Sequence, residues 1–223
     1  MKRLILLGLC LVLFAGSAFS LDWAIGGGGM FNLSWSNGES NHDVWTNTDK
    51  LTISRQGFGG FAFLGLGRYI ELNFGFMYKN PSKLTIADEL LGNIEQDMSG
   101  FDPVIALQFG AYFKYPIVMS ERIVLFPTLG IDYEMNVNDS ENLWWDDLWF
   151  RAGVGMDVFF SDRLFLRTHL IYGYGIMIGT DDSIFGSLNQ AINYYAGYYW
   201  YDPFTANSYS HGLLVKVGIG FMF

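Results

Sequence analysis

The sequence predicts an all-β fold, an eight-stranded antiparallel up-and-down transmembrane β-barrel with short turns at one rim and long loops at the other. Three observations support this fold class. Apolar residues alternate with small or polar residues through eight segments, the first twenty residues have the order of a signal peptide, and the chain ends on phenylalanine. Side chains of a strand alternate between two faces, so each segment has one apolar face. A strand of about ten residues with one apolar face is long enough to cross a bilayer.

The N-terminus has the order of residues that directs export. Lys2 and Arg3 form a positive start, and an apolar run follows over 4–14. Small residues then lead to an expected cleavage between Ser20 and Leu21. This order predicts a secretory signal peptide.

The expected cleavage divides the chain into a signal peptide, 1–20, and an outer-membrane barrel domain, 21–223. A membrane anchor is disfavoured because the apolar run is too short to span about 30 Å of hydrocarbon. A lipoprotein signal would use Cys10, but Leu9 before it is large and the apolar run would be divided. Cys10 is the one cysteine of the chain, so no disulfide is expected in the barrel domain.

The composition argues against several classes of protein. The formal net charge is −9 and no basic stripe is present, which argues against a nucleic-acid partner. No apolar run of about 18 residues follows the signal segment, so no transmembrane helix is expected. The chain is 51% hydrophobic and 18% aromatic, with 27 glycines. Such a composition is typical of a barrel that turns an apolar aromatic surface towards lipid.

The eight alternating segments are the expected strands. In chain order they are 23–35, 53–66, 69–79, 103–115, 123–135, 148–160, 164–178 and 209–223. Short connections are expected at 67–68, 116–122 and 161–163, and long polar loops at 36–52, 80–102, 136–147 and 179–208. This asymmetry is typical of outer-membrane barrels, which have short periplasmic turns and long extracellular loops.

The second strand is the least regular of the eight. Phe58, Phe61, Phe63 and Leu64 break strict alternation, which we interpret as a β-bulge. A soluble β-sandwich is the main alternative fold. Its polar face would carry many more Lys, Glu and Ser residues, whereas the charged residues here share a face with the glycines. The transmembrane barrel is therefore favoured.

This architecture resembles that of the small outer-membrane barrels of the OmpW, OmpX and OmpA transmembrane-domain kind. The resemblance covers 21–223 and depends on the signal peptide, the amphipathic strands and the C-terminal aromatics Phe221 and Phe223, with no diagnostic motif. It implies a place in the outer membrane of a diderm bacterium, contact with its lipid, and recognition of the last strand by the barrel assembly machinery. The length and hydrophobicity favour the OmpW kind, for which the resemblance implies passage of small, often hydrophobic, molecules.

Charged residues on the inward faces form the candidate site, here called the lumen charge network. Its predicted members are Glu71, Lys114, Asp132, Glu134, Arg151, Asp157, Arg167, His169 and Lys216. Unpaired charges in a partly dry lumen are costly, so these groups are expected to pair and fix the barrel rather than conduct ions. The expected cross-strand neighbours are Asp157 and Arg167, Asp132 and Arg151, Glu134 and Trp149, and Glu71 and Lys114. The inward glycines either leave unfilled room or permit the strong coiling of a small barrel.

Catalysis and metal binding have little support in the sequence. Ser208, Ser210 and His211 faintly resemble the Ser and His of barrel-type lipid A hydrolases, but a histidine at the membrane rim is the commoner explanation. No enzyme activity, catalytic residue or cofactor is expected. The acidic loop residues lack the spacing of a known calcium loop, so no metal site is expected either. These residues are Asp139, Glu141, Asp146, Asp147, Asp181 and Asp182.

Two classes of function follow from this architecture. One is permeation of small solutes through the barrel, and the other is interaction of the extracellular loops with a partner. The last long loop is rich in aromatic residues over 194–204. This segment fits either a contact surface or a tyrosine-lined extension of two strands at the membrane interface.

Overall fold

A computed structural model describes residues 23–41, 48–88, 92–98, 103–137, 146–178 and 209–223. The expected signal peptide, 1–20, and the aromatic segment 194–204 lie outside the described residues. Within the described ranges, no helix is long and apolar enough to cross a membrane.

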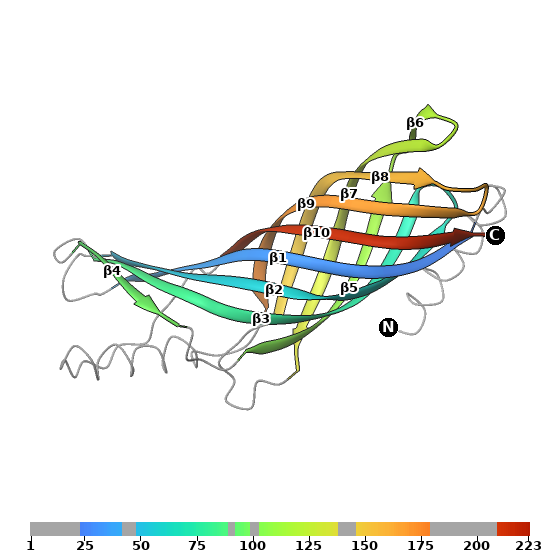
Figure 1. Ribbon diagram of the computed structural model, residues 1–223. Coiled ribbons are helices and arrows are strands. Elements are labelled where there is room, and N and C mark those ends of the chain that lie inside the picture. The colour runs from blue at the N-terminus through green and yellow to red at the C-terminus, as the bar shows by residue number, and fades with distance from the viewer. Residues whose placement is uncertain (1–22, 42–47, 89–91, 99–102, 138–145, 179–208) are drawn as a thin grey trace, which may run out of the picture.

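Ten strands form one antiparallel sheet that closes on itself (Figure 1). They are β1 (Trp23–Asn41), β2 (Thr48–Leu66), β3 (Ile70–Asp88), β4 (Gly92–Asp97), β5 (Val104–Lys114), β6 (Ile117–Ser120), β7 (Ile123–Asn136), β8 (Asp146–Phe159), β9 (Leu164–Ile178) and β10 (Tyr209–Met222). Eight of them, all except β4 and β6, pair with their neighbours in chain order, and β10 pairs with β1. The predicted eight-stranded up-and-down β-barrel is confirmed.

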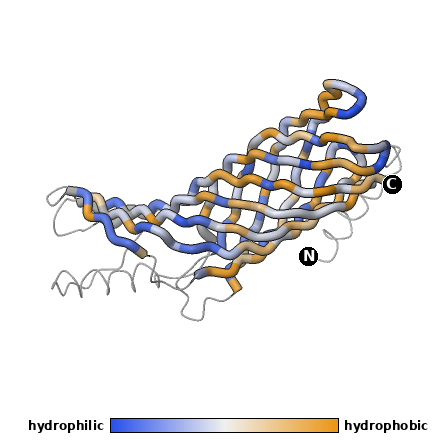
Figure 2. Tube along the Cα trace, viewed as in Figure 1, coloured by the Kyte–Doolittle hydropathy of each residue, from blue (hydrophilic) through white to orange (hydrophobic). Residues whose placement is uncertain are grey.

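The outer surface of the barrel is a belt of exposed aliphatic and aromatic side chains. On β10, Val217 and Ile219 are 46% and 56% exposed, whereas the intervening and preceding residues Gly218 and Lys216 are buried. Figure 2 shows the same alternation of hydropathy along the other strands. An apolar band around a closed barrel is the surface that faces lipid. The strands therefore cross a membrane, as the alternation predicts.

The first three strands extend well beyond the membrane. β1, β2 and β3 have 19 residues each, and β5 has 11. Because about 9–11 residues suffice for one crossing, the surplus continues the same sheet beyond the barrel, where β4 joins as a fourth strand at the left of Figure 1. This extension sheet consists of 38–41, 48–51, 83–88 and 92–97.

The expected loops at 36–52 and 80–102 are therefore wrong in part, because much of each is strand. Strands outside a membrane need no lipid-facing apolar side, so these polar segments lack the alternation that marks the membrane strands. At the other rim, the expected turn at 116–122 contains β6, which pairs with the first residues of β7.

The bulge expected at Phe58–Leu64 is also wrong. β2 alternates strictly there, with Phe61 and Phe63 buried and Phe58 exposed, and its pairing with β3 is continuous. The register shift lies earlier, between Ser54 and Arg55. The prediction failed because apolar side chains occur on both faces of this strand, with Phe61 and Phe63 buried and Phe58 exposed.

Inward glycines make room for these rings. A Cβ atom at Gly220 would lie 2.3 Å from Cζ of Phe165 and 2.8 Å from Cζ of Phe63. A Cβ atom at Gly26 would lie 2.5 Å from the Phe63 ring. The room that the glycines leave is thus filled by aromatic side chains from neighbouring strands, as in the aromatic rescue of sheet glycines.

Candidate functional site

All nine members of the predicted lumen charge network are buried on the inner side of the barrel. The structure adds Lys79 and Asp147, which the sequence prediction missed. Lys79 continues the inward alternation of β3 through Glu71, and that spacing was the available signal. Asp147 was assigned to a loop, but it lies in β8. Among the described residues, the buried charged side chains include five acids and five Lys or Arg residues. The acids are Glu71, Asp132, Glu134, Asp147 and Asp157, and the bases are Lys79, Lys114, Arg151, Arg167 and Lys216.

The cluster nearest the periplasmic rim is centred on Glu71. Its Oε2 accepts hydrogen bonds from Nζ of Lys114 at 2.9 Å and from Nη1 of Arg167 at 2.6 Å. Its Oε1 accepts from Nδ2 of Asn73 at 2.8 Å. Arg167 also donates from Nε and Nη2 to the two oxygens of Asp157, at 2.7 and 2.6 Å. Asp157 and Arg167 lie directly opposite each other on β8 and β9, as the sequence predicts.

Aromatic rings surround the Arg167 guanidinium. Its Cζ lies 4.4 Å from the centre of the Phe63 ring, 4.8 Å from that of Phe165 and 5.6 Å from that of Phe126. His169 packs edge-on against Phe126, with ring centres 5.2 Å apart. Rings next to a desolvated guanidinium stabilise it by cation–π attraction while excluding water. Arg167 therefore combines a bidentate ion pair with Asp157, a hydrogen bond to Glu71 and contacts with three aromatic rings.

A second cluster, centred on Asp132, lies deeper in the barrel. Oδ2 of Asp132 accepts from Nε2 of Gln108 at 2.8 Å, from Nε of Arg151 at 3.0 Å and from the hydroxyl of Tyr112. The Arg151 guanidinium stacks on Trp149, with its Cζ 4.3 Å from the ring centre. These contacts join β5, β7 and β8 through one carboxylate.

The register predicted for β7 and β8 is wrong by two residues. Asp132 lies opposite Trp149, not Arg151, and Glu134 lies opposite Asp147. The observed pairs are centred one residue earlier in the chain than the predicted pairs. An even shift keeps every side chain on its face, so Arg151 still reaches Asp132 diagonally. Likewise Lys114 reaches Glu71 although Glu71 is paired with Tyr112.

A third set of contacts lies towards the extracellular rim. Lys79 on β3 forms a buried ion pair with Glu134 on β7. Nearby, Nη1 of Arg55 donates to Oγ of Ser36 at 3.0 Å, and the Ser36 and Ser210 hydroxyls are 2.9 Å apart. Ion pairs and hydrogen bonds thus connect the strands at three levels of the barrel.

Several side chains at the centre of the lumen have no surface that water can reach. Glu71, Asp132, Arg151, Phe165 and Ile171 are each 0% exposed. A side chain that lines a water-filled channel keeps exposed surface on the side of the channel. At these positions the lumen is therefore filled by side chains, as expected for a barrel of eight strands.

The faint hydrolase pattern is not supported by the geometry. Ser210 is buried, whereas His211 is on the outward face of the same strand. Consecutive residues of a strand point to opposite faces, so these two side chains do not meet as nucleophile and base. Ser208 and His42 lie outside the described residues.

Among the described residues, no group of three His, Cys, Asp or Glu side chains is placed to hold a metal ion. Oδ1 of Asp146 accepts from the backbone N–H of Asn136 at 3.0 Å, and Oδ2 accepts from the hydroxyl of Tyr133. This carboxylate therefore closes the end of the β7–β8 hairpin. The other acidic loop residues, apart from Asp147, lie outside the described residues.

The two C-terminal aromatics lie on the outer surface at the periplasmic rim. Phe221 is 37% exposed and Phe223 is 71% exposed, with ring centres 5.2 Å apart. The N–H of Phe223 donates to the Trp23 carbonyl at 2.8 Å, which fastens the end of the chain to the start of β1. The expected assembly signal is thus accessible from outside the barrel.

Comparison with known proteins gives similarity of fold only. No protein-family model and no curated protein matches the chain. The outer membrane protein OprG from Pseudomonas aeruginosa is 11% identical with a TM-score of 0.43, over 91% of this chain and 96% of that one. The outer membrane protease OmpT from Escherichia coli is 6% identical with a TM-score of 0.48, over 93% and 100%. The translocator domain of the autotransporter NalP from Neisseria meningitidis is 12% identical with a TM-score of 0.26, over 100% and 96%. The closed ring of eight strands and its apolar belt give this chain the fold of an outer-membrane β-barrel.

Proposed function

We propose that this chain is a surface interaction protein of the outer membrane, in which a closed barrel anchors an extracellular contact surface. The observation that supports this function best is a contrast between two parts of the molecule. The central lumen side chains have no water-accessible surface, whereas three strands run far beyond one membrane crossing. Because a packed lumen is not a route for solutes, the role that we assign to the barrel is to anchor the extension sheet at the membrane.

The extension sheet has the composition of a recognition surface. On β4, the five residues 93–97 are all exposed, and they combine amide and carboxylate side chains with Ile94, which is 45% exposed. Lys83 on β3 forms an exposed ion pair with Glu95 on β4. These polar and charged groups resemble the polar rim of a protein–protein interface, and Ile94 offers an apolar contact beside them.

Passage of small hydrophobic molecules, which the OmpW resemblance implies, is the second hypothesis. It needs a route that bypasses the packed centre of the barrel. The lumen around Glu71 and Asp132 offers no such route without breaking several hydrogen bonds at once. We therefore rank this function below surface interaction.

Shortening the extension sheet tests the proposed function. Asn37 on β1 is paired with Thr52 on β2, so a two-residue Asn-Gly turn can replace 38–51 and close the hairpin at that pair. Proteoliposomes with the full chain are expected to bind to at least one of a panel of cells and protein-coated surfaces, and the shortened chain is expected to lose that binding.

The control replaces the periplasmic turn, 161–163, with the same Asn-Gly turn, and it should leave binding unchanged. Heat-modifiable migration on gels checks that all three proteins are folded. Equal binding by the full and the shortened chains, together with solute uptake by the liposomes, would favour permeation instead.

A further inference from the structure

β6 projects beyond the ring of eight strands at the periplasmic rim (Figure 1). It forms a hairpin with the first residues of β7, which also pair with β8. Every residue of β6 is exposed. The other two periplasmic connections, 67–69 and 161–163, contain no strand. The closure of the barrel does not explain this hairpin, because β6 pairs with β7 outside the ring of eight strands.

Apolar side chains lie on both faces of the hairpin. Ile117 is paired with Leu125 on the outward face, and Val118 is paired with Val124 on the opposite face. Ile117, Val118 and Met119 are 45%, 70% and 61% exposed. β6 is an edge strand, because the residues of β7 that pair with it also pair with β8. An exposed apolar patch of this kind marks a contact surface. Another apolar medium is therefore expected to cover it.

The outward face of the hairpin continues the lipid-facing belt of the barrel. Tyr115, just before β6, is 57% exposed, and Phe160, at the end of β8, is 61% exposed. The carbonyl of Arg122 at the hairpin tip accepts from the N–H of Phe159 at 2.8 Å, so the tip lies beside the end of β8. β5 already has the 11 residues of a full crossing. These positions put β6 at the membrane boundary.

The free edge of β6 limits how deep the hairpin can lie. Within the described residues, β6 pairs with β7 alone, so the backbone N–H and C=O groups on its other edge have no partner strand. Unsatisfied backbone groups cost several kcal/mol in the hydrocarbon core, so open sheet edges are not found there. At the interface, water and lipid headgroups can bond to that edge.

We propose that the β6 hairpin is an interfacial lipid anchor, seated at the boundary of headgroups and acyl chains in the periplasmic leaflet. Ile117 and Met119, which alternate onto the outward face, contact the upper acyl carbons of phospholipid. Glu121 and Arg122 at the tip lie among the headgroups. The anchor fixes the depth and the tilt of the barrel on one side of its periplasmic rim.

Spin labelling tests this anchor in bilayers of phosphatidylcholine and phosphatidylglycerol. The full chain carries Cys10→Ser, so that an introduced cysteine is the one labelled site. A nitroxide is attached at Ile117→Cys or Met119→Cys, and its collisions with oxygen and with a water-soluble nickel complex are compared. Val217→Cys, in the lipid belt, and Asp162→Cys, in an exposed periplasmic turn, are the controls.

The anchor predicts oxygen-to-nickel collision ratios at 117 and 119 well above that of the Asp162→Cys label and below that of the Val217→Cys label. A ratio equal to that of the Asp162→Cys label would place the hairpin in water and overturn the proposal. Protection from both reagents would overturn it too, because it would show a protein partner or a second copy on this surface. Since β6 lies outside the barrel ring, labels on β6 should leave heat-modifiable migration unchanged. The same gel checks that the two control variants are folded.

Discussion

Arg167→Ala is expected to destabilise the folded barrel by about 3–5 kcal/mol. The substitution removes three short hydrogen bonds and leaves the Asp157 carboxylate buried without its bidentate partner. A buried charge that loses its partner costs more than the pair contributes. Urea unfolding in lipid vesicles, followed by tryptophan fluorescence and gel migration, measures the change in unfolding free energy.

The double variant Arg167→Ala with Asp157→Ala is the matched control for this prediction. It removes the stranded carboxylate as well, so it should be more stable than Arg167→Ala alone. Glu71 keeps Lys114 and Asn73 as partners in both variants. The single variant Asp157→Ala completes the comparison. If the changes in unfolding free energy of Arg167→Ala and Asp157→Ala add up to that of the double variant, the side chains are not coupled and the lumen pairing is wrong.

Val217→Arg is expected to destabilise the barrel by about 2–4 kcal/mol, because it places a charge on the lipid-facing side of β10. The same replacement at Gln96, an exposed residue of β4 in the extension sheet, should have little effect. Refolding yield and urea unfolding in vesicles measure both changes. Similar costs at the two positions would mean that β10 does not face lipid.

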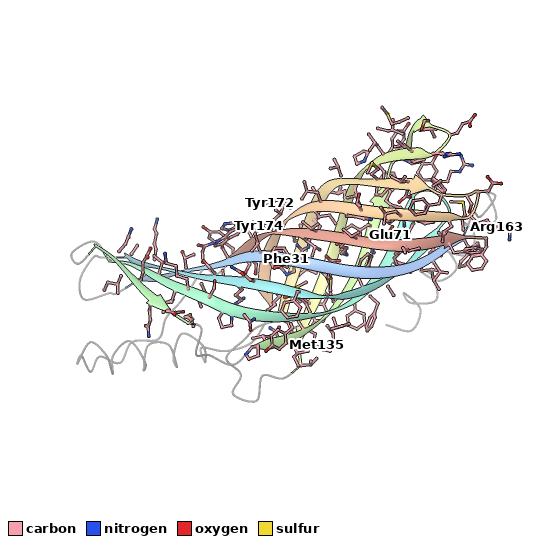
Figure 3. The ribbon with its side chains drawn as sticks, in the orientation of Figure 1. Phe31, Glu71, Met135, Arg163, Tyr172 and Tyr174 are labelled. Atoms are coloured by element: carbon pink, nitrogen blue, oxygen red, sulfur yellow. The ribbon has the colours of Figure 1, made fainter. Side chains whose placement is uncertain are left out.

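The barrel itself could be predicted because lipid imposes a strict rule on every crossing strand. Residues such as Val217 and Ile219 had to be apolar, and their neighbours Lys216 and Gly218 had to point inward. The outward Tyr172 and Tyr174 on β9 follow the same alternation (Figure 3). The inward faces of the strands therefore predicted nine members of the lumen charge network, although Lys79 on the inward face of β3 was missed.

The remainder could not be predicted because no such rule applies to it. The lumen accepts aromatic rings as well as charges, so the inward Phe61 and Phe63 were misread as part of a β-bulge. The extension sheet lies outside the membrane and has no lipid-facing side to mark its strands. Cross-strand partners across long loops depend on loop geometry, which is why Asp132 and Arg151 were displaced by two residues from the expected pairing.

The central claim is that the lumen is a packed, charge-paired core and that the barrel serves as an anchor. Planar-bilayer recording on the folded full chain tests it most directly. We predict no current steps above those of the bare bilayer at neutral pH, because Glu71, Asp132 and Arg151 leave no water-accessible surface at the centre of the barrel. Reproducible single-channel steps whose size changes in Glu71→Gln would contradict the claim and would assign the lumen to conduction.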